Sequence, residues 1–144
     1  MKSHIFTDGA TLGHNGPLGT VKKVGLGIFC QEPRIEIAEK VDGGSNNEAE
    51  FMALIRGMEE AIRLKITDVH YYLDSQIVWR RAACPKKGKK NIYFRPKGKQ
   101  KNERMDAFQD TVLGLAANFK RIEFSWIPRE ENSMADFLSK KALE

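Results

Sequence analysis

The chain has 144 residues, 41% of them hydrophobic and 30% charged, which is typical of a globular protein long enough to bury one core. No apolar run approaches the roughly 20 residues of a membrane span, and the N-terminus lacks the apolar region of a signal peptide. Cys30 and Cys84 show no metal-binding or redox spacing. A reduced cytoplasmic compartment is therefore the default. We also expect a monomer that does not contact membranes.

The net charge of +5 is unevenly distributed. Residues 80–104 contain eleven lysines and arginines and a single acid, whereas the rest of the chain is net acidic. A local basic patch on an acidic domain favours a polyanionic partner. The alternative is a solvated basic loop without a partner.

The first half of the chain predicts a strand, a glycine-rich loop, two strands joined by a hairpin, and a helix. The expected bounds are, in order, residues 3–8, 9–19, 24–29, 34–41 and 45–65. Ser45 and Glu48 have the spacing of a capping box, with Ser45 as the N-cap. Small residues on one helical face, among them Ala53 and Gly57, would let the helix lie close to a sheet.

The second half predicts a strand and a short helix, then the basic segment, and finally a helix, a strand and a last helix. The expected bounds are residues 68–73, 75–79, 80–104, 103–118, 121–127 and 132 onward. This order indicates an α/β fold with a mixed sheet. Strand 68–73 follows a crossover helix, so we expect it to lie parallel to strand 3–8.

Asp8 and Asp74 each follow an apolar strand, and the parallel pairing would place them side by side. An ionised carboxylate in the centre of a sheet is costly unless something compensates its charge, and a metal ion would do so. The structural alternative for each aspartate is a turn at the end of a strand.

Two other acids are candidates for the same site. Asp136 lies in the first turns of the last helix, where a carboxylate also favours the helix dipole. Glu48 already has a structural role in the capping box, whereas Glu50 lies about 200° around the helix from it, toward the sheet. We therefore choose Glu50.

Four carboxylates with almost no histidine nearby suit a hard cation such as Mg²⁺ or Mn²⁺. A pair of such ions can hold the attacking and leaving oxygens of a phosphodiester displacement. The basic segment would then bind the phosphodiester backbone. The pattern thus predicts a metal-dependent enzyme that acts on nucleic acid.

Four short motifs in this order resemble type 1 ribonuclease H over residues 3–143. They are Thr7-Asp8-Gly9, Ser45-Asn46-Asn47 with Glu50, Asp74-Ser75-Gln76, and Asn132 with Asp136. The resemblance implies a ribonuclease H-like fold, with a five-stranded mixed sheet of order 3-2-1-4-5 flanked by helices. It also implies a single domain over residues 1–144, with a basic protrusion at about 80–104.

The resemblance further implies two-metal hydrolysis of the RNA strand of RNA–DNA hybrids, with Mg²⁺ or Mn²⁺, leaving 3′-hydroxyl and 5′-phosphate ends. The catalytic, metal-binding carboxylates would be Asp8, Glu50, Asp74 and Asp136. The substrate-binding residues would be Asn46, Asn47, Gln76, His14, Ser45, Lys86, Lys87, Lys89 and Lys90. Amide side chains can both donate hydrogen bonds to the 2′-hydroxyl and accept them from it. The structural alternative is that these amides cap helices or stabilise turns.

One departure from the family concerns the link between the last strand and the last helix. Residues 126–132 contain no histidine, so the chain resembles a compact variant without the catalytic-loop histidine. Arg129 is a candidate auxiliary residue that could approach the scissile phosphate, although it cannot shuttle protons at neutral pH. The alternative is a solvated arginine.

Two other functions stay open at this point. One is a catalytically weak module that binds hybrids or double-stranded RNA, which the presence of all four carboxylates disfavours. The other is a metal nuclease of the same fold that acts on DNA, which the amide residues disfavour.

Overall fold

The structure is a computed structural model that describes residues 1–12, 22–83 and 103–144. In these residues the chain forms five strands, four α-helices and one 3-10 helix. Their bounds are β1 Ser3–Thr11, β2 Lys23–Cys30, β3 Ile35–Asp42, α1 Asn46–Arg63, β4 Asp68–Leu73, α2 Gln76–Ala83, α3 Glu103–Ala116, β5 Arg121–Trp126, η1 Arg129–Glu131 and α4 Ser133–Lys141. None of the helices in the described residues combines the length and the hydrophobicity needed to cross a bilayer.

The strands form one sheet in the order β3-β2-β1-β4-β5. β1 lies at its centre, antiparallel to β2 and parallel to β4. β5 continues the sheet in parallel with β4. The predicted α/β fold, the mixed sheet and the strand order are therefore confirmed.

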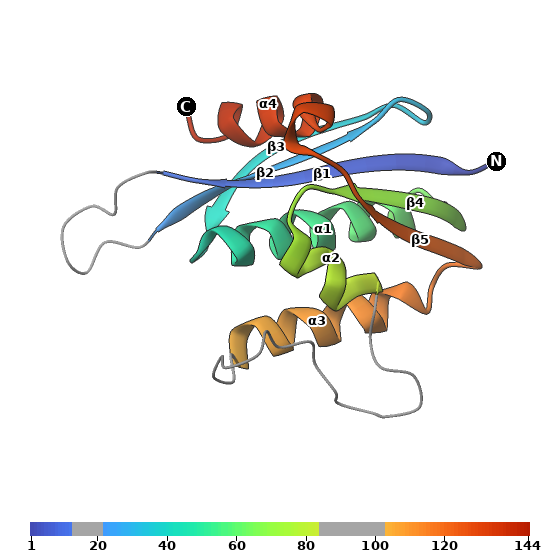
Figure 1. Ribbon diagram of the computed structural model, residues 1–144. Coiled ribbons are helices and arrows are strands. Elements are labelled where there is room, and N and C mark those ends of the chain that lie inside the picture. Colours follow the sequence, from blue (N-terminus) through green and yellow to red (C-terminus); the bar gives the residue numbers. More distant parts are fainter. Residues whose placement is uncertain (13–21, 84–102) are drawn as a thin grey trace.

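The sheet is covered by helices on both faces (Figure 1). α1, α2 and α3 lie on one face, and α4 lies on the other. α1 packs against β1 at Gly57, where an added Cβ would lie 3.1 Å from Cγ2 of Thr7. The small residue thus permits the close helix–sheet contact that the sequence predicts.

α1 begins with the predicted capping box. Oγ of Ser45 accepts a hydrogen bond from the backbone N–H of Glu48 at 3.2 Å, and Oε1 of Glu48 accepts one from the backbone N–H of Ser45 at 3.4 Å. Two of the donors that a helix start leaves unpaired are thereby satisfied. Glu48 also pairs with Arg104 of α3 at 3.1 Å.

Ser45→Ala is expected to lower the free energy of unfolding by about 1 kcal/mol, because the N–H of Glu48 loses its acceptor. Urea denaturation measures the change. Ser45→Asn is the matched control, since asparagine is an equally good N-cap and should preserve the stability. Equal stability of the Ala variant and the wild type would contradict a capping role for Ser45.

α4 packs on β2 because two glycines leave room for its backbone. A Cβ on Gly25 would collide with the carbonyl oxygen of Ser139, and a Cβ on Gly27 would collide with that of Ala135. The first turn of α4 therefore lies over the centre of the sheet, which positions Asp136 close to Asp8.

β1 is longer than predicted and continues through Gly9 to Thr11. Gly9 pairs with Leu26 of β2, so Asp8 lies inside a strand and not at its end. The sequence favoured a loop because glycine often interrupts strands. In the structure, Gly9 serves packing instead, since an added Cβ would collide with the backbone of Ala49 in α1.

α2 is also longer than predicted and takes up the first residues of the basic segment. Arg81 is only 3% exposed, and its Nη1 donates to Oδ1 of Asp106 at 2.9 Å and to Oε1 of Gln109 at 3.0 Å. These contacts join α2 to α3. Arg81 is therefore part of the protein interior, although the sequence analysis counts it in the predicted basic segment 80–104.

Candidate active site

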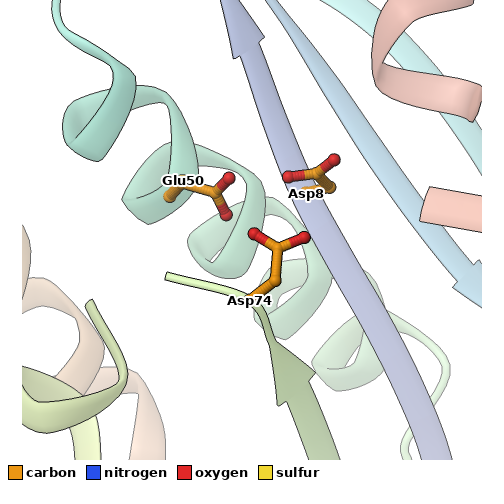
Figure 2. Close-up of side chains that lie close together, drawn as sticks. All are labelled: Asp8, Glu50 and Asp74. Atoms are coloured by element: carbon orange, nitrogen blue, oxygen red, sulfur yellow. The ribbon is translucent and has the colours of Figure 1, made fainter. Parts of the chain in front are cut away.

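Three carboxylates from three different elements converge beside the central strand (Figure 2). Asp8 comes from β1, Glu50 from α1, and Asp74 directly follows β4. One oxygen of each carboxylate lies within 4.8 Å of the other two. The parallel pairing of β1 with β4 brings the two aspartates together, and the close packing of α1 brings the glutamate to them.

The structure separates Glu50 from Glu48 in the way that the helical periodicity predicts. Glu48 stays in the capping box, whereas Glu50 is 8% exposed and its carboxylate points toward those of the two aspartates (Figure 2). Its Oε2 is buried and has no hydrogen-bond partner among the residues that the structure describes.

The electrostatics of the cluster favour a bound cation. Burial raises the pKa of Asp8 to about 7; its hydrogen bond with Glu50 opposes the rise, and the charge of Asp74 adds to it. Burial also raises the pKa of Glu50 well above its ordinary value, and its hydrogen bond and charge interaction with Asp8 add to that effect. A cation would offset the cost of these crowded charges, and the all-oxygen donor set fits a hard divalent ion.

Asp136 lies next to Asp8, outside the group of three. Its Oδ2 is 3.0 Å from Nζ of Lys140, and its Oδ1 is 3.5 Å from Nη2 of Arg129. Burial pushes the pKa of Asp136 upward, but hydrogen bonds with Lys140 and Asp8 and the nearby positive charges hold it below its usual value. The fourth carboxylate is thus ionised and paired with two cations.

Asn132 has a role in the site that the sequence did not reveal. It was predicted to open the last helix, yet its side chain makes no capping hydrogen bond. Instead its Nδ2 donates to the carbonyl oxygen of Thr7 and to Oδ2 of Asp74, both at 3.0 Å. Asn132 is 1% exposed, so it ties the start of α4 to the carboxylates in a buried position.

Two residues of α4 that were not predicted also contact the site. Ser139 is fully buried, donates from Oγ to the carbonyl oxygen of Asp136 at 2.8 Å, and lies 3.5 Å from Oδ2 of Asp8. Lys140 stands four residues after Asp136, which is the spacing of a helical ion pair and was a usable signal in the sequence.

The predicted amide residues stand at helix starts near the carboxylates. Asn46 is the first residue of α1, and its Oδ1 accepts a hydrogen bond from Oγ1 of Thr11. Oδ1 of Asn47 accepts one from Oγ of Ser75 at 3.2 Å, which links the starts of α1 and α2. Gln76 is the exposed first residue of α2. The other predicted substrate residues, His14, Lys86, Lys87, Lys89 and Lys90, lie outside the described residues.

Comparisons with known proteins agree with this site. The family model for RNase H matches residues 1–144. A ribonuclease H of Trichodesmium erythraeum is 32% identical over 145 residues, which cover 96% of this chain and 86% of that protein.

Two other similar proteins add information about length and ligands. The bifunctional protein Rv2228c of Mycobacterium tuberculosis is 28% identical over 149 residues, but the whole of this chain covers only 36% of it. The chain thus spans about a third of the length of that relative. LC11-RNase H1, isolated from compost and solved in complex with an RNA/DNA hybrid, superposes with a TM-score of 0.62 at 25% identity, with 99% of both chains covered.

Proposed function

Because this chain belongs to the RNase H family, we propose that it is an endoribonuclease that hydrolyses the RNA strand of RNA–DNA hybrids. The observation that carries the proposal is the convergence of Asp8, Glu50 and Asp74 within 4.8 Å. The hybrid bound to the similar LC11-RNase H1 supports the choice of substrate. The products would carry 3′-hydroxyl and 5′-phosphate ends.

The three converging carboxylates would hold two Mg²⁺ or Mn²⁺ ions together with Asp136. The oxygen-only donor set and the unpartnered Oε2 of Glu50 fit hard cations. Such ions, when bound, lower the pKa of the attacking water and neutralise the negative charge that develops on the oxygens of the phosphorane-like transition state. Asn132 would keep Oδ2 of Asp74 in place through its 3.0 Å hydrogen bond, so that the site does not reorganise during the reaction.

The amide side chains would recognise the substrate as RNA. Each 2′-hydroxyl both donates and accepts hydrogen bonds, and Asn46, Asn47 and Gln76 carry both kinds of group. The hydrogen bond from Ser75 to Oδ1 would orient the amide of Asn47, whose Nδ2 hydrogens and second oxygen lone pair would serve the substrate. We further propose contacts from His14 and from the hydroxyl proton of Ser45.

Arg129 would act as an auxiliary residue in the absence of a histidine from residues 126–132. Its guanidinium lies 3.5 Å from Asp136 and so carries positive charge to the edge of the carboxylate site. That charge could approach the scissile phosphate, whereas proton transfer would need another group.

Residues 1–144 would act as one monomeric domain whose basic protrusion binds the substrate backbone. The lysines proposed for this contact are Lys86, Lys87, Lys89 and Lys90. Phosphate contacts of this kind position a nucleic acid without reading its sequence, so we expect little sequence preference.

Cleavage of a labelled hybrid tests the proposal. With Mg²⁺ or Mn²⁺, the protein is expected to cut only the RNA strand, to leave duplex DNA intact, and to stop when EDTA is added. Mapping of the product ends checks the predicted 3′-hydroxyl and 5′-phosphate. Binding of the hybrid without cleavage at any metal concentration would favour a binding module over an enzyme.

A further inference from the structure

A pocket of about 440 Å³ lies at the N-terminal end of β1 and has no role in the proposed reaction. Figure 1 shows that this end of the sheet lies away from α4, and among the described residues none from α4 lines the pocket. Its volume is in the range of pockets that hold small organic molecules. Three residues with rings and three with polar or charged side chains are part of its lining, namely His4, Phe6, Phe29, Lys2, Gln31 and Glu32.

Two phenylalanines on neighbouring strands form the apolar walls of the pocket. Phe6 of β1 pairs directly with Phe29 of β2, but within the described part of the chain their rings do not stack on each other. Tyr72 stacks on Phe6 with 4.6 Å between the ring centroids, and the guanidinium of Arg34 lies 5.1 Å from the centroid of Phe29. The pocket thus separates the two rings, and a flat ring that enters it can stack on Phe6.

The ring of Phe6 ends a larger aromatic stack on this face of the sheet. Tyr72 also stacks on His70, with the centroids 4.3 Å and the ring planes 8° apart. Nδ1 of His4 lies 2.7 Å from the hydroxyl of Tyr72, which ties a third strand position to the stack. These contacts hold the Phe6 wall in place before a ligand binds, so little ordering is needed. A fixed ring wall favours a planar aromatic ligand, because stacked rings gain more than their buried area alone.

The other lining residues can serve the polar parts of such a ligand. Gln31 offers an amide that donates and accepts, and Glu32 offers carboxylate oxygens that accept from N–H groups. Nζ of Lys2 lies 2.8 Å from Oε1 of Glu123, whose side chain is exposed, so the ammonium can exchange part of this contact for an anion. A nucleotide combines the flat ring, the polar ring edge and the anion in one molecule.

We propose that this pocket is a second nucleotide-binding site, in which an unpaired base stacks on Phe6 and its phosphate pairs with Lys2. The base is that of a free nucleotide or of an unpaired residue in a single strand. A base inside a duplex cannot enter, because its faces are already stacked and its edge is already paired. The site is separate from the carboxylates, and the inference does not depend on the cleavage reaction.

Proton NMR of the histidine rings reports on the pocket directly, because the chain has only three histidines. His4→Gln and His70→Gln assign the signals of the two rings in the stack. Titration with adenosine 5′-monophosphate in EDTA should shift the C–H signals of His4, which lines the pocket. Phe6→Leu should lower the affinity about 5- to 100-fold, as for the loss of one base–ring stack, whereas Phe6→Tyr keeps the ring and should bind like the wild type.

Comparison with adenosine, which lacks the phosphate, tests the role of Lys2. The wild type should bind the monophosphate about 2- to 5-fold more tightly than adenosine, as for one exposed ion pair, and Lys2→Gln should abolish this difference. Lys23→Gln is the matched control, because Lys23 pairs with Asp42 and does not line the pocket. A Lys2→Gln variant that keeps the full difference would overturn the phosphate position.

A single-stranded tetranucleotide of adenine distinguishes the two sources of the base. Tighter binding of the tetranucleotide than of the monophosphate, with the same loss in Phe6→Leu, assigns the pocket to an unpaired strand; equal binding assigns it to a free nucleotide. Thermal melting verifies that Phe6→Leu is folded, and Phe29→Leu is a second variant that should also weaken binding. His4 signals that neither probe shifts, or equal affinities of the wild type and both leucine variants, would overturn the site.

Discussion

Glu50→Gln is expected to lower the rate of hybrid cleavage by at least about 10²–10³-fold, measured with saturating hybrid and Mg²⁺. Glutamine keeps the size of the side chain but removes the negative charge that the site directs at a cation. Glu50 is buried, and its unpartnered Oε2 is the oxygen that most needs a cation. The loss should therefore appear mainly in the rate and in the Mg²⁺ concentration needed, with little change in the affinity for the hybrid.

Glu48→Gln is the matched control, because it changes the same residue type two positions away. It should cost at most about 1 kcal/mol of stability through the capping box and leave cleavage largely intact. In EDTA, Glu50→Gln should instead raise the melting temperature, since it removes a carboxyl group whose ionisation is penalised by burial and by the neighbouring carboxylates. Loss of activity in Glu48→Gln with retention in Glu50→Gln would contradict the site as described.

The metal-free protein is expected to lose about 2–4 kcal/mol of stability as the pH rises from about 4.5 to 8. In the folded protein the pKa of Asp8 is raised from 3.8 to about 7, and burial raises that of Glu50 as well. Between the unfolded and folded pKa values the folded state binds more protons than the unfolded state. Stability therefore falls as pH rises through this window.

Saturating Mg²⁺ should flatten or reverse this pH dependence, because the ion binds the ionised carboxylates of the folded state. Urea denaturation at about pH 5 and pH 8, in EDTA and in Mg²⁺, measures both effects. Burial lowers the pKa of His70, which makes stability rise with pH, so a His70→Gln background removes this opposing contribution. An equal loss of stability with and without Mg²⁺ would argue against a cation at the carboxylates.

The carboxylate cluster was accessible from the sequence because local patterns fix its geometry. Asp8 and Asp74 each come with an apolar strand, and a crossover helix makes those strands parallel. Helical periodicity then separates Glu50 from Glu48. These relations depend on neighbours in the chain and on general rules of connection, so they hold without knowledge of the tertiary contacts.

The features that the sequence did not reveal depend on distant partners. Gly9 resembles a strand breaker until its contact with Ala49 of α1 is known. Arg81 lies in the predicted basic segment, yet it is buried and donates a hydrogen bond to Asp106, which is 25 residues later in the chain. Asn132 is a good helix cap by composition, but its hydrogen bond to Asp74 spans 58 residues. No local pattern encodes these contacts.

The buried contacts of Arg81 with Asp106 and Gln109 also have a consequence for protein engineering. They join the end of α2 to the start of α3. The buried contacts between these two helices therefore come from residues on either side of the segment 84–102, and not from the segment itself. The entropic cost of bringing the two ends of a loop together rises only slowly with the length of the loop. We therefore expect that segments of different length and charge can replace residues 84–102 while the contacts of Arg81 with Asp106 and Gln109 are kept.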